Sequence, residues 1–184
     1  MEINCAQARV GSNPTSSAKM KKSVLIYAFS SWGGKSKNVS QEVLQALEVQ
    51  ADKVTLKVKF EYEPYKDIVK RGYNLIVGLG QYPRGRSIRI ERFAQNLFGS
   101  RAKGYVPIEL GGPDKIELDL RLTPMPGVLF SDDAGRFVCN FSMYTLMRHK
   151  KKETKLAFFH IPKQVGVDWA TEVVSKLLAQ VGVQ

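Results

Sequence analysis

Residues 23–29 read SVLIYAF, and this unbroken apolar run decides the fold class. A short apolar run that ends at turn residues, here SSWGG at 30–34, is typical of a buried strand. Further short apolar runs lie at residues 74–79, 127–130 and 156–160. Because such strands alternate with segments of helical spacing, the sequence predicts a three-layer α/β/α single domain at residues 23–184, with a mainly parallel central sheet.

Helices are predicted from caps and from apolar spacing. In the last segment, Trp169, Val173 and Leu177 recur on one face and should line the inside of a helix. The expected boundaries are a helix that begins at Asn38 or Ser40, a short helix ended by Gly72, a helix over about 135–148, and a last helix capped by Asp168. Alternating apolar and polar residues predict half-exposed strands at 53–62 and 115–122.

The composition predicts a soluble, cytoplasmic protein. No apolar run is long enough to span a bilayer, so we expect no membrane partner. Cys5 and Cys139 are the two cysteines, and their separation suits neither a disulfide scaffold nor a metal site, so we expect no metal. Residues 1–22 are rich in Gly, Ser, Asn, Pro and Thr and lack a secretory pattern, which predicts a disordered leader.

The net charge of +11 suggests an acidic partner. The basic residues gather in two clusters, one of them the run 148–152 and the other made of Arg84, Arg86, Arg89 and Arg92. The simpler interpretation of the run is the solvated end of a helix, where cations complement the helix dipole. Because aromatic-rich and helix-turn-helix signatures are absent from the sequence, nucleic acid is not the favoured partner.

Cys139 and His160 are the candidate reactive pair. Cys139 follows a small-residue turn that opens a predicted helix, where the helix dipole favours a thiolate. His160 closes the apolar run 156–160. Ligands bind beyond the carboxyl ends of parallel strands, so we expect Gly80, Asp132 and His160 to share one edge of the sheet.

A third group normally orients the imidazole of a Cys–His pair. The residues alone leave Glu91, Asp132 and Asp133 as candidates. They also leave a simpler interpretation, because a lone cysteine is usually a small buried hydrophobe. A redox-sensing thiol is a further alternative, and it would need neither Glu91 nor His160.

Separate motifs in one order add to this reasoning. They are AFSSWGG at 28–34, NVS at 38–40, Gly80 followed by ERFAQN at 91–96, AGRFVCN at 134–140, and FFHIP at 158–162. Over residues 24–164 the chain resembles the pyroglutamyl peptidase I family of cysteine peptidases. In that family these positions read GF-x-PFGG, NP[ST], glycine followed by ERxAxN, AGxxVCN and FIHIP.

The resemblance implies a cofactor-independent cysteine exopeptidase that acts on peptides with an N-terminal pyroglutamyl residue. Its implied catalytic residues are Cys139 as nucleophile, His160 as base and Glu91 as the orienting carboxylate. The implied substrate-binding residues are Phe29, Trp32 and Phe137 around the lactam ring, Gln81 and Val138 near its polar edge, and Arg101 beside the reacting carbonyl. An uncharged lactam suits such flat apolar walls with a few aimed hydrogen bonds.

Several departures from the family concern the rim of the pocket. Trp32 replaces a phenylalanine, Val39 replaces a proline, and a family RIPDN segment survives as Arg101 alone. The segments after Arg101 and Pro162 are shorter than usual, and in the family both contribute to the rim or to contacts within a homo-oligomer, often a tetramer. The alternative hypothesis is a catalytically degenerate paralogue that binds acidic partners through its basic surface, including Lys150, Lys151 and Lys152.

Overall fold

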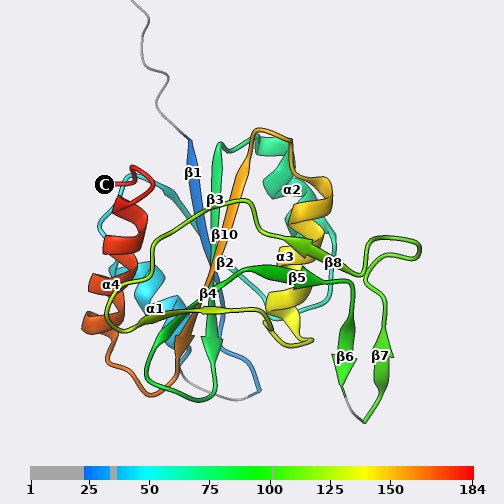
Figure 1. Ribbon diagram of the computed structural model, residues 1–184, viewed down its shortest axis with the longest axis horizontal. Coiled ribbons are helices and arrows are strands. Elements are labelled where there is room, and N and C mark those ends of the chain that lie inside the picture. The colour runs from blue at the N-terminus through cyan, green and yellow to red at the C-terminus, as the bar shows by residue number, and fades with distance from the viewer. Residues whose placement is uncertain (1–22, 34–36, 101) are drawn as a thin grey trace, which may run out of the picture.

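The computed structural model describes residues 23–33, 37–100 and 102–184 (Figure 1). A six-stranded sheet with the order β2-β1-β3-β10-β4-β9 forms its centre. These strands are β1 (Val24–Phe29), β2 (Asp52–Leu56), β3 (Leu75–Tyr82), β4 (Ile88–Glu91), β9 (Val128–Ser131) and β10 (Lys155–Pro162). The predicted leader at 1–22 and Arg101 lie outside the described residues.

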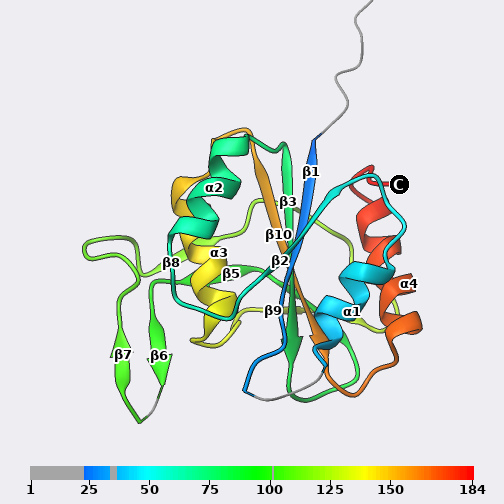
Figure 2. The ribbon, with the colours of Figure 1, turned by 180° about the vertical axis from the view of Figure 1, so that it is seen from behind.

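Helices cover both faces of the sheet (Figures 1 and 2). The helices are α1 (Val39–Ala46) and α4 (Val167–Ala179) on one face, and α2 (Glu63–Arg71) and α3 (Val138–His149) on the other. The predicted three-layer α/β/α architecture is therefore confirmed. In the described part of the chain, no helix has the length and apolar character needed to cross a bilayer.

The direction of two strands, β4 and β9, differs from what the sequence predicted. Strands β2, β1, β3 and β10 are parallel, but β4 runs antiparallel to β10, and β9 runs parallel to β4. Strand β9 therefore runs opposite to β10, and the chain leaves β9 at the amino end of β10. The prediction that Asp132 and His160 share one carboxyl edge of the sheet was wrong. Local apolar runs carry no information about strand direction, which long-range pairing decides.

The pleat of the sheet selects which side chains face α3. Ile88 and Ile90 of β4 pack into the core beneath α1 and α4. Because neighbouring strand residues point to opposite faces, Arg89 and Glu91 face the α3 side. His160 on the adjacent β10 faces the same side as Phe158, which belongs to the core beneath α3. Three polar side chains thus gather on one face.

Two smaller sheets flank α3. They are β5 (Phe93–Gln95) with β8 (Lys115–Glu117), and β6 (Phe98–Ser100) with β7 (Gly104–Val106), a hairpin that projects from the body (Figure 1). Asn140 fastens α3 to this region: its Oδ1 accepts the N–H of Gln95 at 2.8 Å, and its Nδ2 donates to the carbonyls of Gln95 and Leu97 at 2.9 and 2.8 Å. These bonds hold the first turn of α3 in place.

The predicted caps of α1 and α2 are confirmed. Asn38 caps α1, since its side chain accepts the N–H of Ser40 at 3.1 Å. Gly72 ends α2 in the left-handed conformation, with φ of 69°. By contrast, α3 begins at Val138 rather than at 135, because the side chain of Asp133 accepts the N–H of Gly135 at 3.0 Å and stabilises a turn instead.

Other boundaries were wrong. The strand predicted at 53–62 ends at Leu56, and the one at 115–122 contains only β8, outside the main sheet. Gly166 is at the N-cap of α4, and Asp168 lies in the first turn instead. Trp169 is 37% exposed and covers the turn at Gly127, whose own φ is 80°. A large ring is accommodated there because glycine leaves the space.

Candidate active site

Cys139 lies in the first turn of α3 and is buried. The first N–H to bond within this helix is that of Phe141, which donates to the carbonyl of Phe137 at 3.0 Å. The preceding N–H groups, at residues 138–140, therefore have no acceptor within the helix and form the positive end of its dipole. No acidic residue occupies this first turn. The location therefore favours negative charge on or near the sulfur atom.

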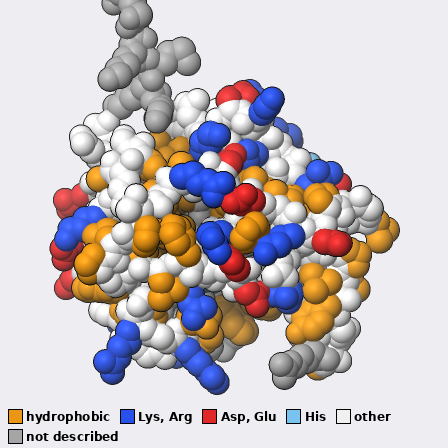
Figure 3. Space-filling model, in the orientation of Figure 1, with side chains coloured by type: hydrophobic (Ala, Val, Ile, Leu, Met, Phe, Trp, Pro, Cys, Tyr) orange, Lys and Arg blue, Asp and Glu red, His pale blue; other side chains and the backbone are white. Residues whose placement is uncertain are grey.

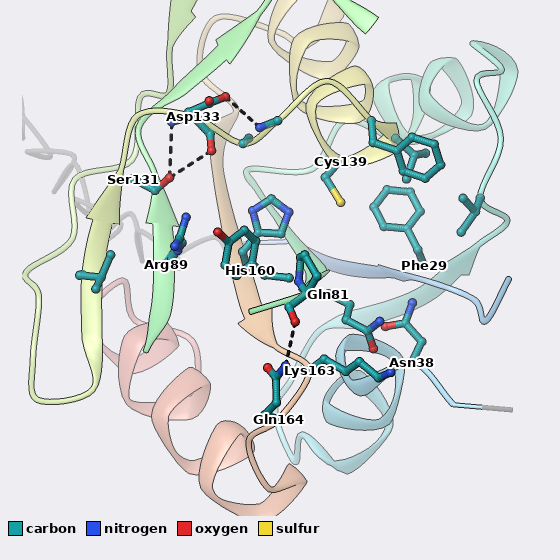
Figure 4. Close-up of a pocket in the computed structure, with 18 of the residues that line it drawn as sticks. Phe29, Asn38, Gln81, Arg89, Ser131, Asp133, Cys139, His160, Lys163 and Gln164 are labelled. Carbon is teal, nitrogen blue, oxygen red and sulfur yellow. Dashed lines mark hydrogen bonds between the residues drawn. The ribbon is translucent and has the colours of Figure 1, made fainter. Parts of the chain in front are cut away.

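Cys139 and His160 meet over Gly80. Figure 4 shows the sulfur atom and the imidazole directed toward the same space. A methyl group on Gly80 would lie 2.8 Å from Sγ of Cys139 and 2.9 Å from Cδ2 of His160. It would also lie 2.9 Å from the ring of Phe158. The absence of a side chain at Gly80 is what leaves room for the thiol and the imidazole to approach each other.

Glu91 holds the other side of the imidazole. Nδ1 of His160 lies 2.7 Å from Oε1 of Glu91, and the side chains are 5% and 1% exposed. The other two carboxylates are paired elsewhere: Arg92 donates to both oxygens of Asp132 at 2.5 Å, and Arg136 donates to Asp133 at 2.5 Å. Of the candidate carboxylates, the structure brings Glu91 to His160.

The charge of His160 follows from these neighbours. Burial by itself would lower the pKa of the imidazole, but the interactions with Cys139 and then with Glu91 outweigh it and raise the pKa to about 9. These two neighbours therefore favour the protonated form of the imidazole. A protonated imidazole can donate a proton to a group bound in front of it.

A cavity of about 1040 Å³ opens in front of the sulfur atom. It is lined by Cys139, His160 and the described members of the predicted substrate-binding set, which are Phe29, Trp32, Gln81, Phe137 and Val138. The ring centroids of Trp32 and Phe137 lie 5.6 Å apart. These rings are 47% and 42% exposed, so they present apolar faces to the cavity. One part of the cavity thus has aromatic walls.

Gln81 supplies a polar group to this aromatic part. Its Oε1 accepts the N–H of Val39 at 3.0 Å, which anchors the side chain to the start of α1. An amide oxygen has a second lone pair, and the amide nitrogen has two N–H donors. Gln81 can therefore both accept from and donate to a ligand while it remains held by α1.

Sequence reasoning missed Arg89 and Tyr82 in the cavity wall. Cζ of Arg89 lies 3.8 Å from the centroid of the Tyr82 ring, and the backbone of Arg89 is level with His160. The sequence placed Arg89 in a basic cluster without indicating a site. Its location follows from the antiparallel pairing of β4 with β10, which local patterns do not reveal.

The basic run at 148–152 is not a uniformly solvated helix end. Arg148 donates to both carboxylate oxygens of Glu109 at 2.5 and 2.8 Å. Lys150, with a side chain only 7% exposed, donates to Asp119 and to the carbonyl of Thr154, each at 2.7 Å. Two of the cations are therefore paired with carboxylates of the protein itself, which weakens the hypothesis of a binding surface centred on this run.

The fold and the site define a class: an α/β protein in which a buried imidazole lies between a thiol at a helix start and a carboxylate. A family model described as pyroglutamyl peptidase matches residues 113–176. The pyrrolidone-carboxylate peptidase of Bacillus cytotoxicus is 31% identical over 171 residues, covering 77% of this chain and 78% of that protein. The one from Thermococcus litoralis is 27% identical over 179 residues, covering 77% and 76%. The chain belongs to the pyroglutamyl peptidase (pyrrolidone-carboxylate peptidase) family.

Solved structures agree on the fold. Pyrrolidone carboxyl peptidase from Thermus thermophilus superposes with a TM-score of 0.73 at 23% identity, covering 84% of this chain and 98% of that one. Pyroglutamyl peptidase I from Bacillus amyloliquefaciens gives a TM-score of 0.69 at 25% identity, covering 84% and 93%. The sheet and its helices are therefore those of the family.

Proposed function

We propose that this protein is a cysteine exopeptidase that hydrolyses the amide bond after an N-terminal pyroglutamyl residue. In this proposal Cys139 is the nucleophile, His160 the general base and acid, and Glu91 the group that orients His160. The observation that carries it is the buried imidazole, which is held at Nδ1 by Glu91 and meets the thiol over Gly80. Membership of the family supports the choice of substrate.

The aromatic part of the cavity suits the pyroglutamyl ring. Phe29, Trp32 and Phe137 would enclose the flat lactam, and the amide of Gln81 would match its C=O and N–H groups. Arg101 keeps its proposed place beside the reacting carbonyl on the strength of the family resemblance. The ring would thereby place the amide bond that follows it in front of the sulfur atom.

The proposed reaction proceeds through a thioester. The thiolate of Cys139 attacks the pyroglutamyl carbonyl, and the N–H groups at the start of α3 stabilise the resulting oxyanion. His160 donates its proton to the leaving amine, and the C–N bond breaks. His160 then accepts a proton from water, whose oxygen attacks the thioester. Pyroglutamate leaves, and Cys139 regains its thiolate beside the protonated imidazole.

A fluorogenic pyroglutamyl amide tests this function. The protein should release the fluorophore, and Cys139→Ala should lower the rate by at least about a thousandfold. Cys5→Ala is the matched control, because it removes the other cysteine, and it should leave the rate unchanged. Thermal unfolding of both variants verifies that they fold. An absence of turnover by folded protein, or equal turnover by Cys139→Ala, would rule the proposal out.

A further inference from the structure

The cavity is larger than a lactam ring requires. Its volume of about 1040 Å³ lies at the upper end of the range for sites that hold whole drug-sized ligands. Beyond His160, away from Phe29, its wall is built from β4, β9 and the turn that follows β9 (Figure 4). If the pyroglutamyl ring occupies the aromatic part, the peptide that follows the cleaved bond enters this second part.

Arg89 is the notable charge in that second part. It lies on the same face of the sheet as His160, and its guanidinium stacks on the ring of Tyr82 at 3.8 Å. Stacking holds the guanidinium plane while its N–H groups at the edge remain available to an acceptor. Within the described residues no carboxylate forms an ion pair with Arg89.

Lys163 is a second cation of the cavity, but Figure 4 shows its side chain directed toward Asn38 and Gln81, away from Arg89. The backbone N–H of Lys163 donates to the carbonyl of Tyr82 at 2.8 Å, so the segment after β10 is held beside the residue on which Arg89 stacks. The side chain is exposed and lines the same cavity. Among the residues that the structure describes, it too has no carboxylate within ion-pair distance.

The acidic residues of this wall do not cancel the charge of Arg89. Asp132 is bound at both oxygens by Arg92, and Asp133 is bound by Arg136 and by the N–H of Gly135. Two arginines thus balance two aspartates, and Arg89 remains as an excess positive charge in this part of the cavity. The second part of the cavity is therefore suited to an anionic group of the substrate.

We propose that Arg89 forms a carboxylate-binding subsite for the residue that follows pyroglutamate. The inference rests on the proposed function and narrows its substrates to pyroglutamyl peptides with a carboxylate on that residue. The carboxylate can belong to an acidic side chain, or it can be the terminal carboxylate of a pyroglutamyl dipeptide. A planar guanidinium donates to both oxygens of such a group.

Three substrates of nearly equal shape test the subsite: pyroglutamyl-glutamine amide, pyroglutamyl-glutamate amide and pyroglutamyl-glutamine with a free carboxylate. At low salt, kcat/KM should be about three- to tenfold higher for at least one of the two carboxylates than for the neutral amide. The substrate with the higher kcat/KM shows whether the subsite binds an acidic side chain or a terminal carboxylate. The preference should diminish at high ionic strength, since salt screens partly exposed charges.

Arg89→Gln should abolish this preference. Arg86→Gln is the matched control, because Arg86 is an exposed arginine of the preceding loop that does not line the cavity, and it should retain the preference. Equal kcat/KM for all three substrates would overturn the inference while the proposed function stands. A preference that survives Arg89→Gln, or that Arg86→Gln also removes, would overturn it as well. No turnover of any substrate would refute the proposed function, and the inference with it.

Discussion

The cavity in front of Cys139 has two unlike parts. The aromatic part, formed by Phe29, Trp32 and Phe137, is apolar and contains the amide of Gln81. The charged part, formed by Arg89 and the two paired aspartates, lies beyond His160 (Figure 4). Under the proposed function, the apolar walls would recognise a group common to all substrates, whereas the charged walls would discriminate between substrates. The difference teaches that recognition and selectivity can be separated on either side of one thiol.

The charged side chains that the structure describes also divide into those paired within the protein and those that are not. On the face seen in Figure 3, basic and acidic side chains are interspersed rather than gathered into one large patch. Arg92, Arg136, Arg148 and Lys150 all have carboxylate partners. A net charge of +11 therefore says less about a partner than the few cations that remain unpaired at the cavity.

Among substitutions around Cys139, Glu91→Gln should cause the largest loss of kcat/KM, while it leaves the contrast between the two parts of the cavity intact. Because the carboxylate raises the pKa of His160, its removal should lower that pKa from about 9 and lower kcat/KM at neutral pH by about a hundredfold or more. The wild-type rate should fall as the pH rises through about 9, and the variant should lose activity at lower pH. A pH profile of kcat/KM measures both effects.

The same substitution should affect both parts of the cavity alike. Glu91 lies behind the imidazole and touches neither wall, so the ratio of rates for charged and neutral substrates should be preserved.

The raised pKa of His160 also predicts how the free energy of unfolding depends on pH. The contribution of His160 to stability is full below its unfolded pKa of about 6.5 and is lost as the pH rises through about 9. If kcat/KM of the Glu91→Gln variant fell at the same alkaline pH as that of the wild type, the proposed role of Glu91 would be contradicted.

Gly80→Ala should have the next largest effect. The added methyl group would lie under 3 Å from Cys139, His160 and Phe158, so these groups must move. We expect a loss of about a hundredfold in kcat/KM and about 1–3 kcal/mol of unfolding free energy. Gly166→Ala is the control, because nothing lies within 4 Å of the added atom. Full activity of Gly80→Ala would mean that the thiol and imidazole do not need this close approach.

Phe137→Ala should have the smallest effect and should be confined to the aromatic part. Removal of a ring that is 42% exposed should lower kcat/KM about tenfold, equivalent to about 1.4 kcal/mol of apolar contact with the lactam. The loss should be equal for charged and neutral leaving residues. Tyr105→Ala, on the projecting hairpin, is the control with a similarly exposed ring. A loss that depends on the leaving residue would break the two-part comparison.

Much of the fold could be predicted because it depends on local pattern. Buried runs such as 23–29 and 156–160 identify strands without knowledge of their partners, and Asn38 and Gly72 mark helix ends by their own side-chain and backbone properties. Predictions failed where tertiary contacts override the pattern. Trp169 has the spacing of a core residue, but the space above Gly127 accommodates it at the surface.

The candidate site divides along the same line. By itself the sequence determined the reactive residue types, the turn before Cys139 and the strand that ends near His160, because these depend on neighbours in the chain. The residue pattern left Glu91, Asp132 and Asp133 open, and the family resemblance implied Glu91; the tertiary structure shows that Glu91 is the one that meets His160. Only the tertiary structure decided that Gly80 leaves the space and that Arg89 faces the cavity. The physical reason is the antiparallel pairing of β4 with β10, which brings residues far apart in the chain onto one face of the sheet. Glu91 and His160, for example, are 69 positions apart. Local periodicity does not encode that pairing.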